Sequence, residues 1–77
     1  MKLDWEHTPG NLRRPWVTKC GQYALYTTAA GSSGPAYIAA WHPVLGGLFY
    51  IGEPRFNHDD AKADCERDCE RRVREAA

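Results

Sequence analysis

Two cysteines stand one helical turn apart in the last third of the chain. Cys65 and Cys69 have the i, i+4 spacing that places both thiols on one face of a helix. A zinc site needs four ligands, and Cys20 and His58 are the remaining residues of suitable type that we weigh. No Cys-x-x-Cys pair or paired-histidine spacing supports such a site. The pattern favours small thiols that fill the space between a helix and a sheet, and we predict no metal and no cofactor.

Two other groups of residues have side chains suited to catalysis. His58, Asp59 and Asp60 are adjacent and have the residue types of general acid–base chemistry, but the start of a helix also favours them as capping and dipole-compensating residues. Cys20 and His42 could act as nucleophile and base, although nothing in the sequence supplies a third group or an oxyanion hole. The sequence therefore predicts a protein that is not an enzyme.

Size and charge narrow the classes of function. The 77 residues suffice for one small domain, which we place at residues 1–77. Residues 1–56 hold five basic and three acidic residues, a net charge of +2, and residues 57–77 hold five and seven, a net charge of −2. Neither part has the clustered lysines and arginines of a strong nucleic-acid footprint.

The sequence also bears on where in the cell the protein is expected. The first ten residues lack the apolar core of a signal peptide, and no apolar run approaches the roughly 20 residues that span a membrane. Three cysteines without framework spacing are typical of reduced thiols. We expect a cytoplasmic protein with no membrane partner.

The elements that position these residues are predicted to be strands followed by a helix. Pro9, Gly10 and Pro15 predict that residues 1–15 form an irregular N-terminal arm. Residues rich in Val, Thr, Tyr and Trp predict strands at 16–28, 36–42 and 48–52. Three sequential strands with connections at 29–35 and 43–47 form an antiparallel meander. The predicted fold is α+β: a three-stranded antiparallel sheet within residues 16–52 and one C-terminal helix packed on one face.

The helix is predicted at residues 57–75. Asn57 is a good N-cap, and acidic residues crowd the first turns while arginines crowd the last, which suits the helix dipole. The apolar positions lie three or four residues apart, which predicts a narrow buried stripe of mostly small side chains. The stripe consists of Ala61, Cys65, Cys69, Val73 and Ala76.

Alternation along the strands predicts two different sheet faces. The face toward the helix is predicted to carry Tyr23, Leu25, Tyr37, Ala39, Trp41, Phe49 and Ile51. The open face is predicted to carry Tyr26, Ile38, Ala40, His42, Leu48 and Tyr50, without a lysine or arginine. A contiguous apolar surface of this kind usually marks a protein contact. In the alternative, the arm, led by Leu3 and Trp5, folds over this face and covers it.

Part of the chain resembles a known class of DNA-binding domain. The segment YIAAW and the following LFYIGEPRFNHDDAKADCERD resemble the sheet-plus-helix core of AP2-type and integrase-arm domains over about residues 36–69. The matching residues are Ile51, Gly52, Phe56, Asn57, Ala61 and Cys65. This resemblance implies DNA binding through the open sheet face. The sequence departs from it there, because Ile38, Ala40, His42 and Tyr50 replace the arginines and tryptophans that read bases in that family.

A longer stretch, about Trp16–Val73, resembles small proteins encoded by phages and prophages, in which a sheet rich in Trp and Tyr precedes a helix like NHDDAKADCE. This resemblance implies a protein that binds and blocks a host protein or protein complex, as anti-CRISPR and other anti-defence proteins do, in the cytoplasm of the host cell. The open face could equally form a homodimer.

The resulting function prediction is a small non-enzymatic protein-binding module. Its predicted partner-binding residues are Tyr26, Ile38, His42, Leu48 and Tyr50, and a histidine at this place could make binding pH-sensitive. A competing docking surface is the acidic pair Glu66 and Glu70 on the outer side of the helix. In the alternative function, the sheet binds DNA and Arg13, Arg14, Lys19 and Arg55 contact phosphates.

Overall fold

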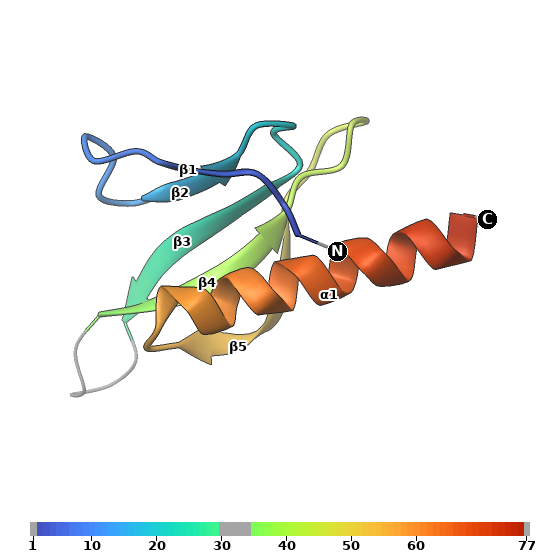
Figure 1. The fold of residues 1–77 in the computed structure, drawn as a ribbon. Coiled ribbons are helices and arrows are strands. Elements are labelled where there is room, and N and C mark those ends of the chain that lie inside the picture. The colour runs from blue at the N-terminus through green and yellow to red at the C-terminus, as the bar shows by residue number, and fades with distance from the viewer. Residues whose placement is uncertain (1, 30–34, 77) are drawn as a thin grey trace.

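The computed structural model describes residues 2–29 and 35–76, which form one antiparallel sheet with a helix on one face (Figure 1). The strands are β1 (Trp5–His7), β2 (Trp16–Thr18), β3 (Tyr23–Ala29), β4 (Pro35–Trp41) and β5 (Phe49–Arg55), and they lie in the sheet in chain order. The helix is α1 (His58–Ala76). The predicted α+β class, the antiparallel meander and the C-terminal helix are confirmed, but the prediction of three strands is wrong, because the sheet has five.

One extra strand arises because the predicted strand at 16–28 is a hairpin. Gly21 has φ 76°, a left-handed conformation that glycine adopts without strain, and its N–H donates to the Thr18 carbonyl at 3.0 Å. The Thr18 hydroxyl donates to the Tyr23 carbonyl at 3.1 Å and accepts from the Tyr23 N–H at 3.2 Å. The chain therefore reverses between β2 and β3, within the segment that was predicted to be one strand.

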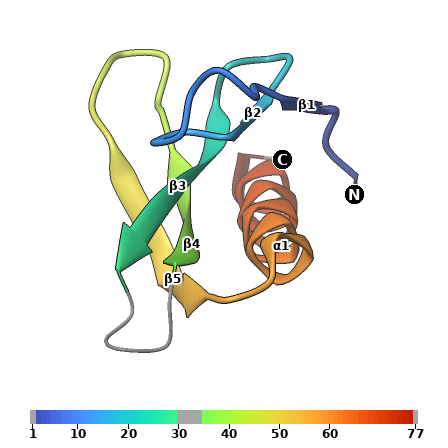
Figure 2. The same ribbon diagram turned by 90° about the vertical axis from the view of Figure 1, so that its left-hand side faces the viewer.

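The other extra strand lies in the segment predicted to be an irregular arm. Trp5 pairs with Thr18 and His7 with Trp16, so β1 extends the sheet beyond β2. Leu3 and Trp5 pack against the core beside α1, on the face opposite to the one they were considered to cover. Figure 2 shows the β1–β2 hairpin bending over toward α1, so that the sheet curls partly around the helix.

The core lies between the sheet and α1 and is built mainly from small side chains. Leu25, Ala39, Ala61 and Cys65 are fully inaccessible to solvent. Small residues at these positions allow the helix backbone to approach the sheet closely, while tryptophan and tyrosine rings close the sides of the core. The predicted helix-facing side of the sheet is confirmed for Tyr23, Leu25, Tyr37, Ala39, Trp41 and Ile51.

The helix begins close to the predicted residue but buries a different stripe. The Asn57 side chain accepts a hydrogen bond from the Asp59 N–H at 2.8 Å, which confirms the N-cap. The prediction that Val73 and Ala76 are buried is wrong, since Val73 is 51% exposed and Ala76 is exposed as well, while Cys69 is half-buried. Figure 1 shows the last turns of α1 running past the end of the sheet. Asp64 and Asp68 are buried instead, together with Ala61 and Cys65.

β5 is an edge strand interrupted by a bulge. Tyr37 pairs with Arg55 and Ala39 with Ile51, so Ile38 alone faces the three β5 residues 52–54. Gly52 supports the bulge with φ 67°, and a proline at position 54 is tolerated because the outer side of an edge strand needs no donor. The bulge leaves Arg55 directed toward α1. The predicted loop at 29–35 has its centre, 30–34, outside the described residues.

Candidate functional site

The open face of the sheet carries a small aromatic cluster made of Tyr26, His42 and Tyr50. The Tyr26 hydroxyl and His42 Nε2 share a hydrogen bond of 2.9 Å, and their ring centroids lie 5.9 Å apart. The Tyr50 ring meets the Tyr26 ring edge-on at 6.2 Å. Three of the five predicted partner-binding residues therefore contact one another, and their rings are held in place before any partner binds.

This cluster explains why two alanines on the open face are buried. Ala40 pairs with Ala24 on one side and with Tyr50 on the other, while Tyr26 pairs with Ile38. Because the Tyr26 hydroxyl reaches His42, four residues beyond Ile38 along the chain, the ring must pass over Ala40. The open face is thus a packed aromatic layer on small residues, and Tyr50, at 59% exposure, is its most accessible member.

The other two predicted residues lie beside this cluster. Ile38 is half-buried and sits opposite the bulge of β5, whereas Leu48, just before β5, is exposed. Phe49 is exposed as well and packs against Trp41 with ring centroids 5.6 Å apart.

The connection between β4 and β5 exposes two large apolar residues, which the sequence analysis assigned only to a connection between strands. The Gly46 N–H donates to the Pro43 carbonyl at 3.0 Å, which closes a turn with Val44 and Leu45 at its centre. Val44 is 84% exposed and Leu45 is 101% exposed. We call Val44, Leu45, Leu48, Phe49 and Tyr50 together the apolar end. The sequence signal for it is a pair of bulky aliphatic residues where turns favour Gly, Asn, Asp or Ser.

The opposite side of the molecule carries charged clusters that sequence reasoning missed. Asp64 accepts two hydrogen bonds from Arg55, at 2.9 and 3.2 Å, and a further one from Arg67. A bidentate arginine–carboxylate pair fixes both side chains in one geometry. The sequence offered one signal for this cluster: Asp64 directly precedes the buried Cys65, and the arginines at 55 and 67 stand on either side of it.

Asp68 is the second buried carboxylate of α1. It accepts hydrogen bonds from the Tyr23 hydroxyl at 2.8 Å, from Arg71 at 2.8 Å and from Arg72 at 2.7 Å. Burial raises the pKa of Asp68, but the hydrogen bonds from Arg72, Tyr23 and Arg71 outweigh it, so the pKa lies below its ordinary value. Burial and the bond to Asp68 raise the pKa of Tyr23 well above its ordinary value. The Arg72 guanidinium also lies over the Trp41 ring, 3.4 Å from its centroid.

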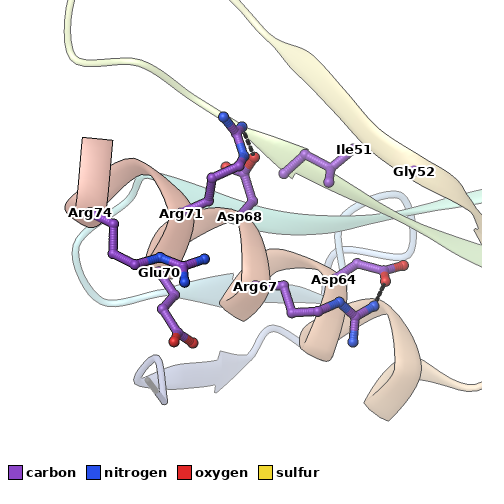
Figure 3. Close-up of a pocket in the computed structure, with 8 residues that line it drawn as sticks. All are labelled: Ile51, Gly52, Asp64, Arg67, Asp68, Glu70, Arg71 and Arg74. Atoms are coloured by element: carbon purple, nitrogen blue, oxygen red, sulfur yellow. Dashed lines mark hydrogen bonds and ion pairs between the residues drawn. The ribbon is translucent and has the colours of Figure 1, made fainter. Parts of the chain in front are cut away.

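Arg67, Arg71 and Arg74 border a groove between α1 and β5, with a volume of about 520 Å³ (Figure 3). We call it the arginine groove. Its lining residues are Ile51, Gly52, Asp64, Arg67, Asp68, Glu70, Arg71 and Arg74.

Glu66 and Glu70, the predicted acidic docking pair, have different surroundings. The Glu66 carboxylate accepts from the Leu3 N–H at 3.0 Å and from the Trp5 indole N–H at 3.4 Å, so it holds the N-terminal segment on α1. Glu70 lines the arginine groove together with Arg67, Arg71 and Arg74. The two residues do not form a continuous acidic strip.

The groups considered for metal binding are scattered. Cys20 is exposed, Cys65 is buried and Cys69 is half-buried. His58 stacks on Trp16 at 5.1 Å. Within residues 2–29 and 35–76, no three metal-binding side chains gather at one place.

The groups considered for catalysis are engaged elsewhere. His42 bonds to Tyr26, and Cys20 Sγ lies 3.3 Å from the Thr18 hydroxyl. His58 Nδ1 lies 3.2 Å from the Asp59 carboxylate, and its ring belongs to the aromatic packing around Trp16. Burial raises the pKa of the Cys65 thiol to about 12, which keeps it protonated and unreactive at neutral pH.

The four basic residues considered for DNA binding lie in different parts of the fold, and one of them is held in an ion pair. Arg13 and Arg14 are exposed in the connection between β1 and β2, and Lys19 is exposed in the β2–β3 turn. Arg55 is bound in bidentate fashion by Asp64 on the helix side of the sheet.

Comparisons with known proteins give no further guidance, because no family model, no curated protein and no solved structure matches this chain. Among the described residues, no helix has the length and apolar character needed to cross a membrane.

Proposed function

We propose that this chain is a non-enzymatic protein-binding module that docks a partner protein through the apolar end. The observation that supports this most is the turn between β4 and β5, where Val44 and Leu45 project into solvent at 84% and 101% exposure. Scattered single apolar residues on a surface are ordinary, but five within seven positions, next to an aromatic sheet face, form a patch.

The fold itself does not account for Val44 and Leu45. Pro43 and the two glycines at 46 and 47, both with φ 103°, provide the conformations that the reversal of the chain needs. Polar residues at the two central positions would make the same turn and expose less apolar surface. The presence of Val44 and Leu45 at these positions is therefore better explained by a contact with another molecule.

A protein is the partner that this surface suits best. Residues 42–50 contain no charged Asp, Glu, Lys or Arg side chain, which disfavours a phosphate backbone, while tyrosine and aliphatic side chains dominate the centres of protein interfaces. Tyr26 and Tyr50 are held by contacts with each other and with His42, so they lose little conformational entropy on binding.

The finer form of the proposal is an inhibitor of a host or defence complex. It rests on the resemblance of the chain to small phage and prophage proteins. A second copy of the chain is the competing occupant of the same surface.

The test is affinity capture from cells that contain the partner, with a matched pair of leucine variants. Leu45 and Leu12 are both large and exposed, at 101% and 84%, but Leu12 lies in the β1–β2 connection, away from the apolar end. We expect Leu45→Ser and Tyr50→Ala each to weaken capture by about tenfold or more, as interface anchors do. Leu12→Ser should leave capture unchanged.

Equal loss in Leu12→Ser, or full capture by Leu45→Ser and Tyr50→Ala, contradicts the proposal. Sedimentation at micromolar concentration tests whether a second copy of the chain, rather than a partner protein, binds to the apolar end. A dimer that Tyr50→Ala dissociates would assign the apolar end to self-association rather than to a partner protein.

A further inference from the structure

The arginine groove has no part in the proposed function, and its charges are arranged unusually. Asp64 and Asp68 are buried, so their carboxylates contribute little to the surface that a ligand would meet. The side chain of Arg67 is 67% exposed and that of Arg71 is 48% exposed. The charge presented at the groove is therefore mostly positive, although arginines and acids are equal in number among its lining residues.

Each buried carboxylate binds two arginines. Asp64 binds Arg55 and Arg67, so one negative charge faces two positive charges there. Asp68 binds Arg71 and Arg72, but Arg71 also binds Glu75, so the charges of that cluster are balanced. A guanidinium has five N–H donors, and Arg67 uses one of them on Asp64, so donors remain for an anionic ligand.

Three arginines line the groove from one side of α1. Figure 3 shows Arg67, Arg71 and Arg74 on successive turns of the helix, with the Arg71 side chain turned toward Asp68 and the Arg67 side chain turned toward Asp64. Four residues of a helix rise by about 6 Å. Alternate side chains on one face of an extended strand are about 6.6 Å apart. Carboxylates at every second position of an extended peptide therefore match the rise between the backbone positions of Arg67 and Arg71.

The other side of the groove is the edge strand β5, which pairs with β4 alone among the strands of the described residues. Before the bulge at Gly52, the segment Phe49–Ile51 presents unpaired backbone groups along its outer side. Such an edge can accept an added strand, whose backbone gains hydrogen bonds while alternate side chains reach the groove.

From the exposed arginines and the free edge together, we propose that the arginine groove binds an extended acidic segment of a protein, with Asp or Glu side chains on Arg67, Arg71 and Arg74 and its backbone paired to β5. A single nucleic-acid strand has similar phosphate spacing, but it cannot use the strand edge. The proposal concerns a different surface from the apolar end and does not depend on it.

The probe is a fluorescein-labelled peptide, TEVEVET, with blocked ends, titrated with the full chain and followed by fluorescence anisotropy. We expect saturable binding that weakens with salt. The matched peptide TQVQVQT should bind at least about tenfold more weakly, because charge-assisted hydrogen bonds are replaced by neutral ones. Amide exchange in the segment Phe49–Ile51 should slow when TEVEVET is bound.

The variants separate the groove from general charge effects. Arg67→Gln with Arg74→Gln should weaken TEVEVET binding by about tenfold or more. Arg13→Gln with Arg14→Gln removes the same charge from the β1–β2 connection and should change binding by less than about twofold. Asp64 keeps its bidentate bond to Arg55 in the groove variant, and thermal unfolding checks that the fold is retained. Arg74→Gln alone is the milder variant, since Arg74 is exposed in the last turn of α1.

Four results would overturn the proposal: no binding of TEVEVET, equal binding of TQVQVQT, equal loss in the two arginine pairs, or unchanged exchange in Phe49–Ile51. Tighter binding of an oligothymidylate, lost in the groove variants, would assign the groove to nucleic acid instead. All of these outcomes are independent of whether Leu45→Ser abolishes partner capture.

Discussion

The two faces of the sheet differ in the side chains that cover them. Toward α1, residues as small as Ala39 and Cys65 bring helix and sheet together, and even the buried acids have fixed partners. At the β4–β5 turn and in the residues that follow it, five large apolar or aromatic side chains are exposed. This contrast indicates that the helix side holds the fold together, while the apolar end carries side chains that the fold does not need.

A pair of leucines gives the largest expected contrast in stability. Leu25 is fully buried and Leu45 is fully exposed. We expect Leu25→Ala to lower the free energy of unfolding by about 3 kcal/mol, because it leaves a cavity in the core. Leu45→Ala should change it by less than about 0.5 kcal/mol. Urea unfolding followed by tryptophan fluorescence measures both, and equal effects would remove the contrast between the regions.

The Asp68 cluster gives the next largest effect. Asp68→Asn leaves Arg72 and the Tyr23 hydroxyl without their charged acceptor, and we expect a loss of about 2 kcal/mol in the free energy of unfolding. Asp60→Asn, at an exposed position on the first turn of α1, is the control and should cost less than about 0.5 kcal/mol. If the two variants are equally stable, the buried acid does not stabilise the helix side.

The same cluster predicts a dependence on acid. The pKa of Asp68 in the folded chain lies below its ordinary value of 3.8, so its stabilising contribution is present above about pH 4 and is lost as the pH falls through the folded pKa. Unfolding free energies measured between neutral pH and pH 2 should therefore fall less steeply below pH 4 in Asp68→Asn than in the wild type. Parallel curves for the two proteins would show that Asp68 makes no such contribution.

The smallest expected effect on stability is at the centre of the open face. Tyr50→Ala removes an edge-on contact with Tyr26 but no buried hydrogen bond, so we expect a loss of less than about 1 kcal/mol. The same variant should remove most partner capture. A loss of 3 kcal/mol or more, measured by urea unfolding, would place Tyr50 with the residues that stabilise the fold rather than with those that bind.

Regular periodicity made the central part of the fold predictable. Alternation along β3 to β5 gave the correct helix-facing residues, such as Leu25 and Ile51, because one face of that sheet is buried. The cap at Asn57 located the helix start. The strand β1 could not be predicted in this way, since its three residues, Trp5–His7, are too few to show a period and are followed by Pro9 and Gly10.

The charged and exposed features needed three-dimensional neighbours that no local pattern reveals. An aspartate in a helix is usually exposed, and Asp68 is buried because Tyr23, far away in the sequence, supplies a hydroxyl. Tyr26, His42 and Tyr50 were identified from alternation, but their mutual contacts depend on the register of β3, β4 and β5. The sequence shows that Val44 and Leu45 are bulky and apolar, but only the structure shows that a closed turn exposes them.

The most direct test of the central claim, that the apolar end is the docking surface, is site-specific photo-crosslinking. Benzoylphenylalanine would replace Val44 in one protein, Leu12 in a second and Glu70 in a third, and each would be irradiated with the captured partner. Our account predicts a crosslinked partner protein from position 44 and none from position 12 or 70. Crosslinks from position 70 alone would move the docking surface to the helix side and contradict the account.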